Sequence, residues 1–197
     1  MRLTLFLTKS LTLRKWHEQG ILDRELAIYH ALQSLGVQIS IVSYGGRDEH
    51  EFLSKLGGMH LLTNWIAWND RRYEHRLHQL HGLSFWRTDI LKTNQMIGAE
   101  VAVRTSRAWN KPLLLRMGYL WSYNAKQAHP DKPKYLQQVE QIETEAIRHA
   151  SHIVVTTEDI RQRIVDRQPQ VADKITRIPN YVDTNVFRPM NEPKQYD

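Results

Sequence analysis

The chain has 197 residues, 41% of them hydrophobic and 24% charged, which is the balance of an ordinary folded protein and not of a disordered one. It contains no cysteine, which excludes disulfides, thiolate metal ligands and cysteine nucleophiles and is compatible with a reducing compartment. Lysine and arginine total 27 against 21 acids, so the net charge is +6. This charge either favours phosphates or anionic lipid as partners or reflects scattered solvent-exposed charges.

No apolar run approaches the ~18 residues that a membrane-spanning helix needs. The first apolar run, residues 2–8, is short, and no small-residue cleavage pattern follows it. The sequence therefore favours a cytoplasmic protein that is not integral to a membrane.

Short apolar runs alternate with longer stretches of helical period along the whole chain. In chain order, the expected strands are residues 2–8, 37–44, 59–63, 89–94, 112–118, 152–157 and 174–179. The expected helices are residues 21–36, 45–58, 96–110, 135–151 and 158–167. A polar loop is expected up to Gly20 and another loop over 119–133, while the Trp-rich and His-rich segment 64–88 is expected to be mostly helical.

This alternation predicts βαβ units and hence a doubly wound, mainly parallel, Rossmann-like sheet with helices on both faces, a three-layer α/β/α fold. We find no internal repeat, no low-complexity tract and no interdomain linker before about Pro189. Residues 1–189 are therefore expected to form one domain.

Ligands of such a sheet bind beyond the carboxyl ends of the strands, where loops and helix N-termini converge. Polar residues follow several of the predicted strands there. The candidates are His17, Glu18, Gly20, Asn94, Gln95, Arg116, Gly118, Tyr119, Thr157 and Glu158.

Two of these assignments have structural alternatives. Arg116 follows three leucines, so its guanidinium either binds an anion at the strand end or forms an ion pair with Glu18 or Glu158. Asn94 and Gln95 either contact a polar ligand or cap the following helix.

Several motifs are weak or missing. A lone Gly20 after the first strand is not the glycine-rich fingerprint of a dinucleotide site, and no P-loop, nucleophile elbow or zinc-protease motif occurs. His75, His78 and His81 spread over a wide arc of a helix, which favours an amphipathic helix, and no metal is expected. The neighbouring tryptophans pack a local core or an interface, or contact a membrane or partner.

The stretch 135–189 carries a more specific pattern. Its parts "VEQIETEAIRHASHIVVTTEDIRQRIVD" and "DKITRIPNYVDTNVFRP" resemble, in order, the end of the N-terminal domain of group 1 (family 4) retaining glycosyltransferases. The earlier stretches "DRELAIYHAL" and "KPLLLRMGY" are similar to the same domain more loosely. The resemblance implies one lobe of a GT-B fold, in which the first domain contributes mostly the acceptor side and the second holds the nucleotide-sugar donor.

The resemblance also assigns roles residue by residue. Gly20 would let the donor phosphates approach, and Thr157 and Glu158 match the family's Ser-Glu pair at the cleft. The frequent histidine after the fifth strand has no counterpart, because Arg116-Met117-Gly118 stands there, and the catalytic residues remain unknown. Tyr181 replaces a family glycine, and the exit from the domain would be fixed by Pro179, Asn180, Asp183, Phe187 and Pro189.

The implied function is the transfer of a sugar from a nucleotide-sugar to a glycan or glycoconjugate acceptor, free or lipid-linked, with retention of configuration. The nucleotide-sugar is the co-substrate and no other cofactor is expected. Residues 190–197 would begin the hinge to a second domain, and without that domain the chain is expected to be inactive. A peripheral contact with the inner face of a membrane would suit a lipid-linked acceptor.

The alternative is a non-catalytic α/β module that binds nucleic acid or another polyanion, suggested by the net charge of +6. No RNA or DNA motif supports it, and the arginines fall on several predicted helices instead of one stripe. Nucleic acid is therefore not expected as a partner.

Overall fold

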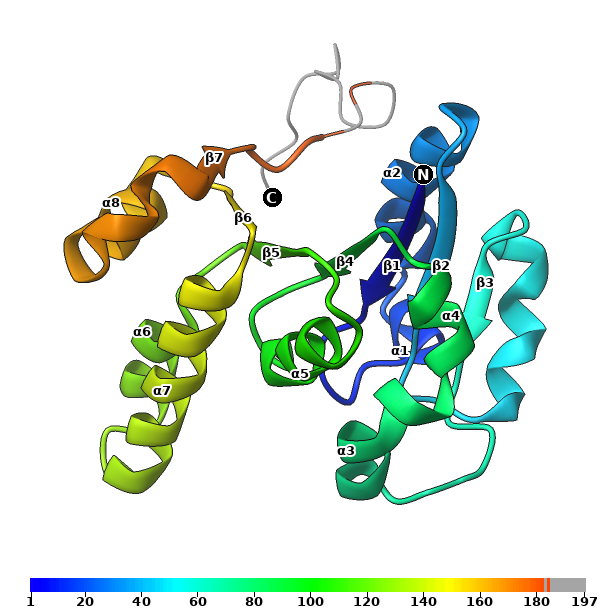
Figure 1. Cartoon of the computed structure of the whole chain (residues 1–197), viewed down its shortest axis with the longest axis horizontal. Coiled ribbons are helices and arrows are strands. Elements are labelled where there is room, and N and C mark those ends of the chain that lie inside the picture. Colours follow the sequence, from blue (N-terminus) through cyan, green and yellow to red (C-terminus); the bar gives the residue numbers. More distant parts are fainter. Residues whose placement is uncertain (183, 185–197) are drawn as a thin grey trace, which may run out of the picture.

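The computed structural model describes residues 1–182 and residue 184, and its centre is one parallel sheet of seven strands (Figure 1). All seven predicted strands are confirmed. They are β1 (Arg2–Phe6), β2 (Gln38–Val42), β3 (His60–Leu62), β4 (Ile90–Thr93), β5 (Leu113–Met117), β6 (His152–Val155) and β7 (Ile175–Arg177).

The strand order is β3-β2-β1-β4-β5-β6-β7, and every neighbouring pair is parallel. The chain winds outward from β1 in two directions, so β1 pairs with β2 on one side (Leu3 opposite Ile39) and with β4 on the other (Leu3 opposite Ile90). In sheets of this kind the crevice at such a reversal is where ligands bind.

The helices occupy both faces of the sheet (Figure 1). They are α1 (Leu13–Glu18), α2 (Leu22–Ser34), α3 (Asp70–Leu80), α4 (Gly82–Arg87), α5 (Ala99–Trp109), α6 (Trp121–Ala128), α7 (Pro133–His149) and α8 (Glu158–Arg167), with 3₁₀ helices η1 (Arg47–Leu56) and η2 (Pro169–Lys174). Each predicted helix is confirmed in place, and the segment 64–88 is mostly helical as expected.

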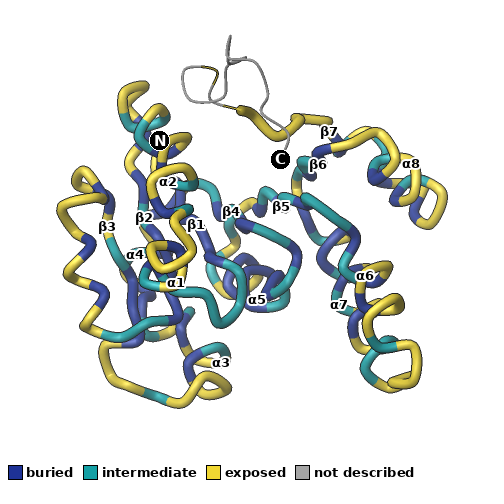
Figure 2. The backbone as a smooth tube through the Cα atoms, turned by 180° about the vertical axis from the view of Figure 1, so that it is seen from behind, coloured by how far each residue is buried: buried dark blue, intermediate teal, exposed yellow. Residues whose placement is uncertain are grey.

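Two hydrophobic cores follow from the alternation of side chains along the strands. On one face of β1 and β2, the residues of α1, α2 and η1 pack against side chains such as Leu5 and Ile41. On the other face, α3, α4, α5, α7 and α8 cover a larger core that contains Leu91, Leu115 and Val155. Figure 2 shows the buried central strands and the exposed outer sides of the helices.

The predicted loop over 119–133 is wrong for residues 121–128, because α6 spans Trp121–Ala128. Proline and asparagine signals suggested a loop, but α6 is held by tertiary contacts: Ser122 and Ala125 are buried, and Glu143 of α7 accepts hydrogen bonds from the backbone N–H and the hydroxyl of Ser122. Packing against α7 therefore outweighs the local turn preference.

The predicted polar loop before Gly20 also contains a helix, α1. Thr12 begins it, with its hydroxyl accepting the Lys15 N–H at 3.0 Å. Leu13 and Trp16 are buried on its inner side, so the segment is a packed part of the domain and only its far end is polar surface.

The chain leaves the sheet after β7. Asp183, Phe187 and Pro189, the predicted domain end at residue 189 and the predicted hinge over 190–197 lie outside the described residues. Within the described residues, no helix combines the length and the apolar character needed to cross a lipid bilayer.

Candidate functional site

Hydrogen bonds join the carboxyl ends of β1, β4 and β5. The Asn94 N–H donates to the Phe6 carbonyl oxygen at 2.8 Å, and the Arg116 N–H donates to the Thr93 hydroxyl at 3.0 Å. Because these strands flank the point where the strand order reverses, their polar ends lie where such folds bind ligands.

Arg116 is held in place by neutral acceptors. Its guanidinium donates to the Asn94 carbonyl at 3.1 Å and to the Asn180 side-chain oxygen at 3.0 Å. The alternative ion pairs with Glu18 or Glu158 do not form among the described residues, and Glu158 pairs with Arg161 instead, at 3.0 Å. Arg116 therefore keeps a positive charge and unused N–H donors, which is the chemistry that binds anionic or hydroxyl-rich ligands.

Gly118 is held between two polar side chains from neighbouring strand ends. Its N–H donates to the Gln95 side-chain oxygen at 3.0 Å, and its carbonyl accepts from the Thr156 hydroxyl at 3.3 Å. A Cβ atom at this position would lie 3.0 Å from the Gln95 oxygen, so a side chain here would push against Gln95. The segment after β5 is thus fixed by the segments after β4 and β6.

Of the two alternatives for Asn94 and Gln95, the capping of the following helix does not occur. The residue before α5 is Gly98, at φ +95°, and no side chain caps that helix. A Cβ at Gly98 would lie 3.0 Å from the backbone nitrogen of Lys9, so the glycine allows the loop after β1 to approach closely. Asn94 and Gln95 instead make contacts across the strand ends, with the Phe6 carbonyl and the Gly118 N–H respectively.

Thr157, Glu158 and Tyr119 stand at the same strand ends in more structural settings. Thr157 caps α8 by accepting the Ile160 N–H at 3.3 Å. Glu158 is exposed and bound to Arg161. Tyr119 follows Gly118, is half-buried, and has its pKa raised by burial.

His17, Glu18 and Gly20 form a separate exposed group at the end of α1. Gly20 has φ +67° and no atom within 4 Å of a Cβ position, so its surroundings are open. Within the described part of the chain, no hydrogen bond or ion pair joins these three residues to Asn94, Gln95 or Arg116.

The segment after β7 contacts β6, Arg116 and the first turn of α2. Ile178 donates its N–H to the Val155 carbonyl at 2.8 Å, Asn180 accepts from Arg116, and the Tyr181 hydroxyl donates to the Arg24 carbonyl at 2.6 Å. Arg24 lies in the first turn of α2, shortly after Gly20. The resemblance gave Asn180 a structural role only, so its contact with a candidate site residue is a finding of the structure.

Sequence reasoning missed Lys92 and Tyr29. The Lys92 ammonium donates to the Tyr29 hydroxyl at 2.9 Å and to the Thr93 carbonyl at 3.3 Å, and it lies 5.4 Å from the centre of the Tyr29 ring. Burial, and then the positive charge of Arg116, lower the pKa of Lys92 to about 7, while Glu25 opposes the shift. A lysine inside the apolar run "DILKT" was the available signal.

Lys92 is expected to make the stability of the protein depend on pH. Its pKa is about 7 in the folded chain against an ordinary 10.5, so the unfolded chain binds more protons between these values. The free energy of unfolding should therefore rise with pH across this window, with a slope of at most about 1.4 kcal/mol per pH unit. Lys92→Met should lack this rise and be more stable than wild type below pH 7.

Urea unfolding at a series of pH values measures this effect. Lys134→Met, at an exposed lysine in the first turn of α7, is the matched control and should follow the wild type throughout. If the free energy of unfolding changes with pH in the same way for wild type and Lys92→Met from neutral to alkaline pH, Lys92 does not titrate as described.

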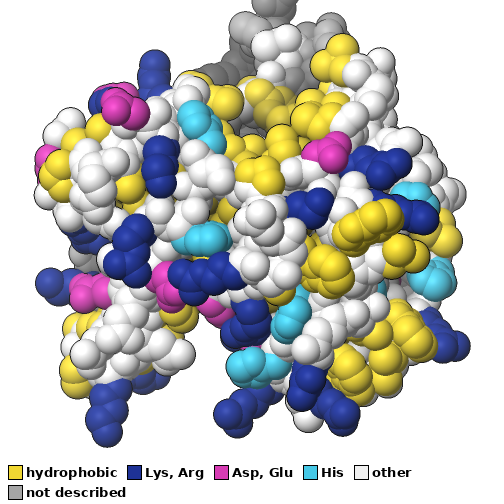
Figure 3. All heavy atoms as spheres, viewed as in Figure 1, with side chains coloured by type: hydrophobic (Ala, Val, Ile, Leu, Met, Phe, Trp, Pro, Cys, Tyr) yellow, Lys and Arg dark blue, Asp and Glu magenta, His cyan; other side chains and the backbone are white. Residues whose placement is uncertain are grey.

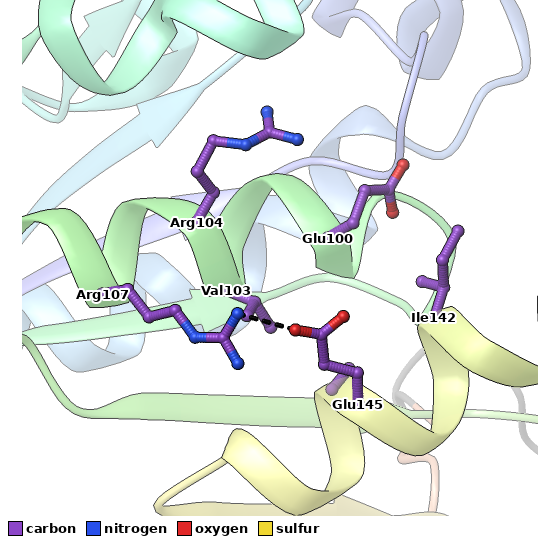
Figure 4. Close-up of a pocket in the computed structure, with 7 residues that line it drawn as sticks. Glu100, Val103, Arg104, Arg107, Ile142 and Glu145 are labelled. Atoms are coloured by element: carbon purple, nitrogen blue, oxygen red, sulfur yellow. Dashed lines mark hydrogen bonds and ion pairs between the residues drawn. The ribbon is translucent and has the colours of Figure 1, made fainter.

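Two pockets lie away from these strand ends. One of about 200 Å³ lies between α5 and α7, beside the Arg107–Glu145 ion pair of 2.6 Å (Figure 4). A second, of about 190 Å³, includes Arg2, Gln38 and His60 at the amino ends of β1, β2 and β3. No group of three or more His, Asp or Glu residues in the described part of the chain is arranged to hold a metal ion.

The comparisons with known proteins concern the fold and the family of the chain. No curated protein matches the chain in sequence. The structure of HepE (Alr3699) of Anabaena in complex with UDP and glucose is similar, with a TM-score of 0.62 and 13% identity over 97% of this chain and 47% of that chain. UGT89C1 of Arabidopsis thaliana in complex with UDP gives a TM-score of 0.53 and 11% identity over 92% of this chain and 50% of that chain.

At such low identity these likenesses show the fold alone, one Rossmann-like lobe of the GT-B architecture. The chain spans about half the length of the solved structures that it matches. The family model that matches is that of Glycosyltransferase Family 4, over residues 26–186. This match covers most of the 197 residues, and the chain therefore belongs to Glycosyltransferase Family 4.

Proposed function

We propose that this chain forms the acceptor side of a glycosyltransferase that transfers a sugar from a nucleotide-sugar to a glycan or glycoconjugate acceptor, with retention of configuration. The observation that carries the proposal is Arg116, a cation without a carboxylate partner among the described residues, fixed at the junction of β4, β5 and the segment after β7. Family membership gives the reaction class, and the solved structures with the same fold were determined with UDP or UDP-glucose.

The acceptor is assigned to the polar groups at the strand ends. Glycans present hydroxyl groups that both donate and accept hydrogen bonds, so they need donors and acceptors side by side. Arg116 and the Asn94 and Gln95 amides supply both at the ends of β4 and β5, with Gly118 and Tyr119 next to them. The remaining acceptor contacts are assigned to His17 and Glu18 at the exposed end of α1.

The donor phosphates are assigned to Gly20, which belongs to the same exposed group as His17 and Glu18 at the end of α1. The open surroundings of Gly20 leave room for the donor phosphates, and Thr157 and Glu158, at the start of α8, are assigned to the cleft. As the glycosidic bond of the donor breaks, negative charge develops on the departing diphosphate, which backbone N–H groups and basic side chains stabilise. The proposal needs the nucleotide-sugar as co-substrate and no metal ion.

The proposed setting is the cytoplasmic side of a membrane, with an acceptor that is free or linked to a lipid. A basic surface would hold the domain close to anionic headgroups and shorten the search for a lipid-linked acceptor. The glycan-bearing end of such an acceptor would then reach the strand ends from the bilayer.

The purified 197-residue chain is expected to bind the acceptor but not to transfer a sugar from a donor. It spans about half the length of the GT-B structures that it matches, and in that architecture the cleft is formed between two lobes. Release of nucleoside diphosphate from a panel of UDP-sugars and GDP-sugars should stay at the background level. Clear sugar transfer by this chain alone would contradict the proposal that this lobe provides only the acceptor side.

Acceptor binding provides the positive half of the test. Backbone amide NMR of the same chain, titrated with candidate glycan acceptors, should show shifts concentrated at residues 94–95 and 116–119. Arg116→Met should abolish these shifts and leave the rest of the spectrum unchanged. Shifts confined to other surfaces would overturn the assignment of the site.

A further inference from the structure

The turn between β3 and α3, residues 64–68, is held in one shape by a buried asparagine. The Asn64 side chain donates to the Trp68 carbonyl at 2.6 Å and accepts the Trp68 N–H at 3.0 Å, while the Asn64 carbonyl accepts the Ala67 N–H at 2.9 Å. Ala67 has φ +58°, an uncommon conformation for a residue other than glycine. Three hydrogen bonds thus fix a turn that would otherwise be unfavourable.

This fixed turn presents apolar side chains to the solvent. Trp65 is 47% exposed and Ile66 is 38% exposed, although both are large and hydrophobic. Figure 3 shows hydrophobic atoms together with Lys and Arg side chains at the lower right of this face, where the turn lies in Figure 1. An exposed pair of this kind on a rigid support is typical of an interaction surface.

Two arginines flank the turn and stack on its tryptophans. The Arg47 guanidinium lies 5.9 Å from the Trp65 ring centre and donates to the Trp65 carbonyl at 3.2 Å. The Arg72 guanidinium lies 4.8 Å from the Trp68 ring centre. Neither arginine forms an ion pair within the described part of the chain, so both remain available for an anionic partner.

We propose that this surface, formed by Arg47, Trp65, Ile66 and Arg72, docks onto a bilayer that contains anionic lipid. Tryptophan prefers the boundary between water and acyl chains, and exposed arginines next to it attract phosphate headgroups. Because the turn is already fixed, docking costs little conformational entropy.

The geometry favours a bilayer over a glycan or a peptide. Arg47 lies over the ring of Trp65, which leaves that ring less open for stacking on a sugar. Neither of the pockets between α5 and α7 and at the amino ends of β1 to β3 includes a residue of this surface. A flat bilayer needs no pocket, whereas a peptide side chain or a sugar ring is usually held in one.

Co-sedimentation of the 197-residue chain with vesicles tests the proposal. The chain should bind vesicles of phosphatidylserine and phosphatidylcholine, and not vesicles of phosphatidylcholine alone. The double variant Trp65→Ser with Ile66→Ser should bind about tenfold more weakly, because the apolar anchor is lost. Arg47→Gln with Arg72→Gln should also lower binding by about tenfold or more and reduce its dependence on salt.

The matched control is Trp86→Ser on α4, because Trp86 is 61% exposed and lies outside the proposed surface. Circular dichroism checks that each variant is folded. An equal loss of binding in the control, or binding by the Trp65 and Ile66 variant at the wild-type level, would overturn the proposal. Tryptophan fluorescence gives a second test, on the part of the signal that is lost in the Trp65 variant. Quenching of this part by soluble glycans and not by anionic vesicles would also overturn the proposal.

This inference rests on the membrane setting of the proposed function and names the surface that makes the contact, but it can fail separately from the acceptor site. Vesicle binding is measured without donor or acceptor, so a negative result removes the docking surface and leaves the acceptor site untouched. Binding of a water-soluble glycan acceptor at residues 94–95 and 116–119, followed by amide NMR, would likewise be unaffected by changes at Trp65 and Ile66.

Discussion

Arg116→Met in a two-lobe enzyme that contains this chain is expected to lower kcat/KM for the acceptor by about 100-fold, with little change in the affinity for the donor. The substitution removes a charged group that holds the Asn94 carbonyl and the Asn180 side chain and that offers further donors to a ligand. Hydrogen bonds to a charged group contribute about 1.5–3 kcal/mol, and lost positioning adds to this. Steady-state kinetics with varied acceptor at saturating donor measure the effect.

The control for this variant is Arg148→Met. Arg148 is exposed near the end of α7 and its side chain has no hydrogen bond or ion pair within the described residues. Its removal should leave the kinetics unchanged. If Arg116→Met behaves like this control while the circular dichroism spectrum stays native, Arg116 is not part of the acceptor site.

Glu143→Ala is expected to lower the free energy of unfolding by about 3 kcal/mol. Glu143 is 2% exposed, and its carboxylate accepts from the Ser122 N–H at 3.1 Å, from the Ser122 hydroxyl at 2.5 Å and from Arg167 at 3.3 Å. Alanine leaves a buried N–H and a buried hydroxyl without their acceptor and removes the link between α6, α7 and α8. Urea unfolding followed by circular dichroism gives the difference.

Two further variants make this test specific. Glu140→Ala, at an exposed site on the same helix, should change the stability by less than about 0.5 kcal/mol. Glu143→Gln keeps one acceptor oxygen, so it should fall between the other two. Equal stability of the Glu140 and Glu143 variants would mean that the cluster does not hold α6 in place.

Most of the fold could be predicted because it depends on local patterns. The period of apolar residues distinguishes strands from helices, and strands that alternate with helices are joined most simply as a parallel sheet. Helix α8 is an example: the predicted range 158–167 and the observed range agree at both ends, since Thr157 caps the start and Gln168 precedes a proline.

The errors share one cause, which is tertiary packing that overrides a local signal. Residues 121–128 have the Asn and Pro neighbours of a loop, but the buried Glu143 supplies acceptors that make a helix favourable there. Residues 13–18 look like part of a polar loop because only Leu13 and Trp16 are apolar, yet those two fill the core beside α2.

The candidate site was found only in outline. Residues after strands could be identified as a group, since the fold class places them at one edge of the sheet. Which of these residues contact one another could not be predicted, because distances across β4, β5 and the segment after β7 depend on the twist and register of the whole sheet. The contact between Arg116 and Asn180 joins residues that are 64 positions apart.

The sequence by itself determined the class of fold, the order of strands and helices, and the likeness to a glycosyltransferase domain. Apolar periodicity and short motifs involve only residues that are close together in the sequence. Only the tertiary structure decided that Arg116 binds Asn180 and not a glutamate, that Lys92 lies against Tyr29, and that Asn64 fixes the exposed turn of Trp65. These facts depend on which side chains the folded sheet brings together, since a charge or a hydrogen-bonding group acquires its role from neighbours that are distant in sequence.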